Sequence, residues 1–163
     1  MNLYVVRHAD AVSLGGEVRS DFDRGLTERG RADATMMARA LAQIDIDIRA
    51  IITSPLMRAV ETGEIFGREL KREAETSRRL EPGFSPKLLT EEIVSLSTGA
   101  GVVAIGHQPD MSMFISYLIS PAHAATVAME TCAIACVHLQ STAQGQLRWL
   151  LTPEVVRALN FSL

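Results

Sequence analysis

The feature that most constrains this chain is a short apolar run that ends abruptly in charged and titratable residues. Residues 3–6 (Leu-Tyr-Val-Val) are too few for a helix and predict a buried strand. Arg7 and His8 follow directly. A strand that is apolar up to its C-terminal tip places such groups at the carboxyl edge of a sheet. Open α/β sheets bind their ligands at that edge, so this stretch is a candidate site.

The rest of the chain alternates between strand and helix patterns. Helix starts are expected at Thr27, at Ser54-Pro55, at Ser85-Pro86 and at Thr152, where a capping side chain or an N-terminal proline stands before an apolar stripe. Residues 13–25 are expected to form a loop over the sheet edge, with Phe22 as its large apolar anchor. Strands are expected at 3–6, 48–53, 72–80 (an edge strand), 102–105, 131–139 and 146–151, and helices at 28–43, 55–70, 86–97, 110–119 and after 152.

This alternation predicts an α/β protein with three layers, a mainly parallel sheet covered by helices on both faces. The length of 163 residues indicates one domain, residues 1–163, with a single substantial core.

Composition indicates which kinds of protein this chain can be. The apolar fraction of 47% and the charged fraction of 21% are those of an ordinary globular protein. A net charge of −3 argues against nucleic-acid binding, which needs a basic surface. Met1 leads straight into the first strand, and no apolar run is long enough to span a membrane, so a cytoplasmic location is expected. Cys132 and Cys136 are expected to be buried thiols, and no Cys or His spacing predicts a metal site.

Titratable and cationic side chains follow three of these predicted elements, at the same edge of the predicted sheet. His8 follows the first strand, Arg58 lies in the first turn of the helix after the second, and His107 follows the strand at 102–105. Arg7 flanks His8, and Arg24 can reach in from the loop. Arginine forks match phosphate oxygens, and a helix N-terminus adds N–H donors. An imidazole at the centre can attack phosphorus without a metal, because arginines neutralise the transferring group.

Four stretches resemble the histidine phosphatase superfamily, also called phosphoglycerate-mutase-like. They are residues 3–11 (LYVVRHADA), 24–30 (RGLTERG), 53–62 (TSPLMRAVET) and 105–109 (IGHQP). The short length and residues 80–86 (LEPGFSP) are most similar to the SixA-type phosphohistidine phosphatases. The resemblance implies a phosphoglycerate-mutase-like fold, with His8 as the nucleophile and Arg7, Arg58 and His107 holding the phosphate. It also implies a further phosphate contact from Arg24.

Two positions depart from the family pattern. Ala9 stands where many members carry glycine, and it would be strained by about 1 kcal/mol if that position required a positive φ. Large members place an acid opposite the nucleophile to protonate an alkoxide leaving group. This chain has no clear equivalent, and Glu81 is the candidate substitute.

The sequence therefore predicts a metal-independent and cofactor-independent phosphatase that works through a phosphohistidine on His8. The favoured substrate is phosphohistidine on a protein, for instance a histidine phosphotransfer domain, because so short a chain lacks the insertions that build a lid over small substrates. The alternatives are a phosphatase of small phosphate esters and a catalytically idle phosphate-binding module on the same fold. Mutase activity is disfavoured because it requires a closed site that keeps water from the phosphoenzyme.

Overall fold

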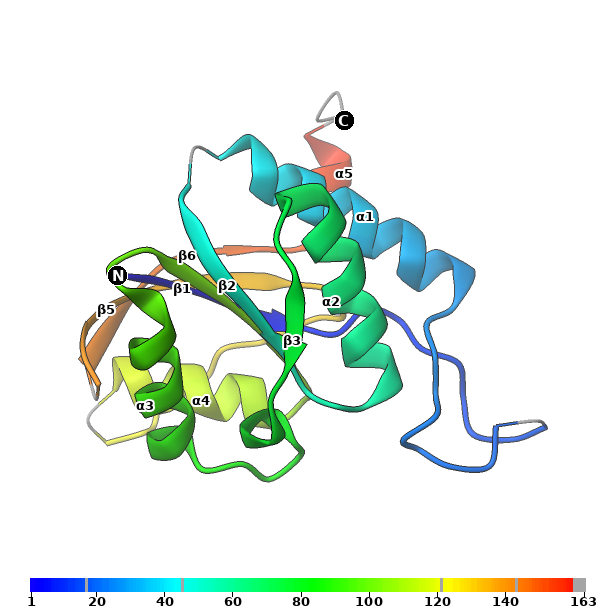
Figure 1. Cartoon of the computed structure of the whole chain (residues 1–163), viewed down its shortest axis with the longest axis horizontal. Coiled ribbons are helices and arrows are strands. Elements are labelled where there is room, and N and C mark those ends of the chain that lie inside the picture. The colour runs from blue at the N-terminus through cyan, green and yellow to red at the C-terminus, as the bar shows by residue number, and fades with distance from the viewer. Residues whose placement is uncertain (17, 45, 121, 143, 160–163) are drawn as a thin grey trace.

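A computed structural model describes residues 1–16, 18–44, 46–120, 122–142 and 144–159 of the chain. The described residues form one six-stranded sheet with the strand order β3-β2-β4-β1-β5-β6 (Figure 1). Strand β1 pairs in parallel with β4, and β2 pairs in parallel with both β4 and β3, whereas β5 runs antiparallel to β1 and to β6. The strands are β1 (Asn2–Arg7), β2 (Ile48–Thr53), β3 (Ala74–Thr76), β4 (Gly101–Gly106), β5 (Ile134–Ser141) and β6 (Gln144–Leu151).

Helices cover both faces of this sheet, which confirms the predicted three-layer α/β class. One face packs against α1 (Glu28–Gln43), α2 (Met57–Leu70) and α5 (Pro153–Ala158), and the other against α3 (Pro86–Ser97) and α4 (Asp110–Ile119). Successive side chains of β1 point to opposite faces of the sheet. Tyr4 and Val6 pack in the core on the side of α1, α2 and α5, and Leu3 and Val5 pack in the core on the side of α3 and α4. All four side chains are at most 2% exposed, as expected for a central strand covered on both sides.

Two of the predicted helix starts are made by the expected side chains. Thr27 caps α1, its hydroxyl accepting from the Gly30 N–H, and Thr152 caps α5 in the same way through the N–H of Val155. Ser85 occupies the cap position of α3 with Pro86 following, although its hydroxyl makes no capping bond. These local signals hold because each lies beside an element that the core also stabilises.

Three sequence-based boundaries were wrong. Helix α2 begins at Met57 rather than Pro55, and Ser54 is not its cap. The strand expected from residue 131 begins only at Ile134, because Cys132 adopts a left-handed φ of 60° that breaks the extended run. The edge strand at 72–80 shrinks to β3, and residues 78–80 form a 3₁₀ turn. Phe22, expected to be the large apolar anchor of its loop, is 51% exposed.

The far edge of the sheet carries an irregularity. Cys136 pairs with Trp149 while Val137 pairs with Leu147, so Arg148 on β6 is an extra residue without a partner position on β5. This is the pattern of a β-bulge, which bends the strand and increases its twist. Both cysteines remain free and buried, as expected.

Candidate active site

The candidate site lies where β1, β2 and β4 end side by side. The sheet continues one step past each tip, because the His8 N–H donates to the Gly106 carbonyl at 2.9 Å and the Ser54 N–H donates to the Ile105 carbonyl at 2.9 Å. From β1 the chain goes on toward α1 on one face of the sheet, and from β4 toward α4 on the other (Figure 1). In α/β proteins the carboxyl edge of the sheet where such a divergence occurs is the place that binds ligands.

His8 is held in one tautomer by its two partners. Its Nδ1 lies 2.7 Å from the Ala9 carbonyl oxygen, and its Nε2 lies 3.2 Å from Arg58 Nε. A carbonyl only accepts and a guanidinium only donates, so we assign the proton to Nδ1 and the lone pair to Nε2. The atom that carries the lone pair is therefore directed at the arginine.

The environment keeps this imidazole neutral. The pKa of His8 is lowered from 6.5 to about 4, chiefly by burial and also by the guanidiniums of Arg58, Arg7 and Arg24, against an opposing contribution from the hydrogen bond to the Ala9 carbonyl. At neutral pH a group with this pKa carries no proton on Nε2. A neutral imidazole among cations has the properties of a nucleophile for an anionic substrate.

Arg58 and Arg24 are joined through a residue that sequence reasoning missed. Arg58, 6% exposed, donates from Nη1 to the Asp21 carbonyl at 2.7 Å and from Nη2 to the Asp21 carboxylate at 3.0 Å. Arg24 donates to the other carboxylate oxygen of Asp21 at 2.8 Å and, from Nε, to the Val12 carbonyl at 2.6 Å. The structure thus brings Arg24 next to Arg58, as expected, with Asp21 between them.

Arg7 and His107 each hold a buried nitrogen without a partner among the described residues. Arg7 donates from Nη1 to the Met129 carbonyl at 2.8 Å, while its Nε is buried and unpaired. His107 packs against His8 with ring centroids 5.1 Å apart, and its Nδ1 is likewise buried and unpaired. Buried polar groups normally have partners, so such atoms mark a place where a ligand supplies them.

Ser54 is the second residue that the sequence did not reveal as part of the site. Its hydroxyl lies 2.7 Å from His107 Nε2. Because α2 begins only at Met57, this hydroxyl does not cap the helix. The pKa of His107 is lowered to about 3, chiefly by burial and also by Arg58 and by His8 when it is protonated, while Asp21 opposes the shift. Ser54 therefore positions a neutral ring, and the only available signal was its place at the tip of β2.

No contact among the described residues joins Glu81 to the cluster of site residues, which comprises Arg7, His8, Asp21, Arg24, Ser54, Arg58 and His107. Its side chain is 50% exposed and forms a 4.0 Å ion pair with Arg78 at the end of the 3₁₀ turn. Ala9 is free of the strain considered above, since it is not among the positive-φ residues of the described chain, and its N–H donates to the Thr62 hydroxyl at 3.1 Å.

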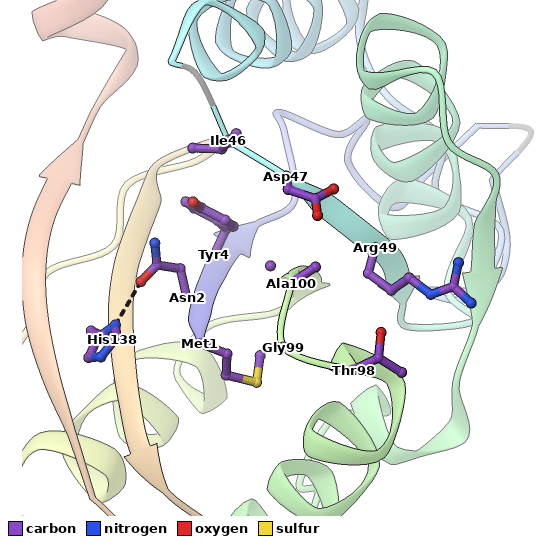
Figure 2. A pocket seen from close by; sticks show the side chains of 11 residues that line it. Met1, Asn2, Tyr4, Ile46, Asp47, Arg49, Thr98, Gly99, Ala100 and His138 are labelled. Carbon is purple, nitrogen blue, oxygen red and sulfur yellow. Dashed lines mark hydrogen bonds between the residues drawn. The ribbon is translucent and has the colours of Figure 1, made fainter.

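A separate cavity lies away from this site. About 690 Å³ opens at the amino-terminal ends of the parallel strands, lined by Asn2, Tyr4, Asp47 and Arg49 among others. Figure 2 shows this pocket, with Asn2 accepting a hydrogen bond from His138 at its margin. It is at the opposite end of β1 from His8, and none of its lining residues belongs to the cluster described above.

Within the described residues, no group of three or more His, Cys, Asp and Glu side chains is placed to hold a metal ion. Among those same residues, no helix combines the length and apolarity needed to cross a membrane.

Comparison with known proteins finds relatives that match most of the chain. An uncharacterised protein of Picosynechococcus is 33% identical over 114 residues, which cover 68% of each chain. The phosphohistidine phosphatase SixA of Escherichia coli is 29% identical over 157 residues, 94% of each chain. A solved structure of the protein histidine phosphatase SixA, in complex with tungstate, superposes with a TM-score of 0.83 at 29% identity and covers 94% of this chain and 97% of its own.

The model of the histidine phosphatase superfamily (branch 1) matches residues 3–82, the segment that carries β1, the Asp21 loop and the start of α2. The SixA proteins extend the similarity over almost the whole chain. The sequence motifs, the six-stranded sheet and these relatives agree, and the chain belongs to the histidine phosphatase superfamily, where it is SixA-like.

Proposed function

We propose that this protein is a phosphatase that transfers the phosphoryl group of its substrate to Nε2 of His8 and then to water. One observation carries the proposal: the Nε2 lone pair of a neutral His8 faces Arg58, and both Arg7 and the adjacent His107 ring keep a buried nitrogen unpaired. Oriented donors around a nucleophile are what a dianionic phosphoryl group requires. Arg7, Arg58 and His107 hold that group, and Arg24 adds a further positive charge beside Arg58.

The two chemical steps follow from these positions. In the first, His8 Nε2 forms a bond to phosphorus as the bond to the leaving group breaks. The leaving imidazole of a phosphohistidine keeps that electron pair and departs as a neutral ring, because its other nitrogen already carries a proton. The Arg58 Nε–H, which now faces Nε2, becomes free to donate to a phosphoryl oxygen. In the second, a water oxygen bonds to phosphorus, the P–N bond breaks and its electron pair returns to Nε2. The proton lost by the water leaves with phosphate or solvent, and the enzyme returns to its starting state.

The favoured substrate is phosphohistidine on a protein. An alkoxide leaving group needs a proton donor, whose help is worth about 10²–10⁴-fold, whereas an imidazole is a far better leaving group. No described contact places Glu81 at the cluster, and Asp21 stays ionised because its bonds to Arg24 and Arg58 lower its pKa. The names of the SixA relatives point to the same substrate class.

The decisive experiment combines chemical trapping with a substrate panel. We expect wild-type enzyme to form a phosphoenzyme that is labile in acid and stable in alkali, as a phosphoramidate is, and His8→Ala to form none. Phosphohistidine protein should be turned over much faster than a phosphoserine peptide or a sugar phosphate, and Glu81→Gln should change that rate less than twofold. An acid-stable phosphoenzyme would refute His8 as the acceptor.

Two outcomes would favour the alternatives. Efficient hydrolysis of a sugar phosphate that is lost in Glu81→Gln would establish Glu81 as the acid and a small ester as the substrate. Tungstate binding without turnover of any member of the panel would indicate a phosphate-binding module.

A further inference from the structure

Asp21 contacts two cationic side chains of the candidate active site from a loop outside the sheet. It lies between β1 and α1, and its side chain is 50% exposed. Its carboxylate receives Arg24 Nη1 on one oxygen at 2.8 Å and Arg58 Nη2 on the other at 3.0 Å. Its backbone carbonyl receives Arg58 Nη1 at 2.7 Å. A single residue thus binds both terminal nitrogens of Arg58.

This arrangement fixes the direction of the Arg58 guanidinium. The group is planar and its N–H donors form a rigid fork, so holding Nη1 and Nη2 also sets where the Nε–H points. In this structure the Nε–H points at His8 Nε2, 3.2 Å away. The contact with Asp21 therefore uses the end of the fork that is remote from His8 and leaves the side next to His8 available.

The loop is attached to the site mainly by these polar contacts. Phe22, the next residue, remains 51% exposed, and its carbonyl accepts from the Met57 N–H at 3.0 Å. Arg24 is held from the same loop by Val12 as well as by Asp21. Burial of apolar side chains around residue 21 therefore contributes little, and the carboxylate and the backbone carbonyl of Asp21 together connect the loop to Arg58.

We propose that Asp21 is a positioning residue, which orients Arg58 and Arg24 so that their donors meet the phosphoryl group beside His8. The inference rests on the proposed function and adds a residue to it. Asp21 carries a negative charge, which by itself repels an anionic ligand. We explain its presence beside Arg58 and Arg24 by its effect on the orientation of these arginines, because displacing a catalytic group by a small distance lowers the catalytic rate.

The charge of Asp21 and its orientation of the arginines have opposite effects on anion affinity, so the affinity for tungstate distinguishes between them. Removing only a negative charge should tighten binding of the anion, whereas losing the orientation of the arginines should weaken it. We expect Asp21→Ala to raise the tungstate Kd about 10-fold in calorimetry, with unchanged stoichiometry showing that the folded fraction is unchanged. Asp23→Asn removes a charge from the same loop at an exposed position and should leave the Kd within twofold of wild type.

Turnover gives the second readout. On phosphohistidine protein, Asp21→Ala should lower kcat about 10-fold with KM changed less than threefold, since orientation acts mainly on the transferring group. In Arg24→Ala the further loss on adding Asp21→Ala should be smaller than in wild type, because the two residues act together. If Asp21→Ala does not fold, Asp21→Asn, which keeps an oxygen acceptor without the charge, should show a weaker loss in the same direction.

Failure of the proposed role of Asp21 and failure of the proposed function would give different results. Tungstate binding by Asp21→Ala that is as tight as in wild type, or tighter, together with unchanged kcat, would overturn the role of Asp21 while leaving the phosphatase intact. Absence of turnover in the wild type would refute the proposed function, and the tungstate Kd would still test whether Asp21 orients the arginines.

Discussion

Acidification should destabilise this protein through His8. Burial and three guanidiniums lower the pKa of His8 from 6.5 in the unfolded chain to about 4 in the fold. Between these values the unfolded chain binds more protons than the folded one, so stability is present above about pH 6.5 and is lost as the pH falls toward 4. At about 1.4 kcal/mol per pKa unit, the loss is about 3 kcal/mol, a large part of a typical domain's stability.

The measurement is urea unfolding of wild type and His8→Ala at several pH values from 7 down to 4. Wild type should lose about 3 kcal/mol more than the variant over this range, on the order set by the pKa. The comparison reports His8 together with its effect on His107, because the other titratable groups are shared and a protonated His8 lowers the pKa of His107. Parallel pH profiles for the two proteins would refute the assignment of a buried, neutral His8.

Three further predictions concern the surroundings of the site. Ser54→Ala leaves the second ring nitrogen of His107 without its partner, so the free energy of unfolding should fall by about 1–3 kcal/mol in urea titration and kcat should fall with it. Gly30→Ala would drive a methyl group into the Asp10 carbonyl oxygen at the start of α1, and should cost about 1–3 kcal/mol or more in the same assay. EDTA should leave the turnover rate unchanged, because the proposed chemistry uses arginines in place of a metal; inhibition reversed by a divalent ion would contradict it.

Much of the fold was predictable because local and global signals coincide. The apolar run of β1 and the threonine caps of α1 and α5 are each read from a few adjacent residues, and the core stabilises the same conformations. The same logic placed His8, Arg58 and His107 together, since parallel strands bring their carboxyl ends to one edge.

The failures have a common physical origin in contacts between residues distant in sequence. Ser54 has the local pattern of a helix cap, but its hydroxyl lies against His107, 53 positions away. Asp21 looks like an ordinary loop carboxylate, and its role depends on Arg58, 37 positions away. No periodicity or turn preference carries information about such pairs. The prediction for Phe22 was wrong for a related reason, because hydrophobicity alone does not show whether a loop side chain packs against the core.

The bulge at Arg148 has a consequence for how the protein behaves among its own copies. An edge strand of eight residues exposes backbone donors and acceptors that could template a strand from another molecule. The extra residue interrupts the repeat of those groups and turns the strand, and the side chain at this point is a guanidinium exposed to solvent. An incoming strand would have to follow an irregular backbone and displace water from a charge. Natural sheets use both devices against aggregation, and β6 combines them at one position.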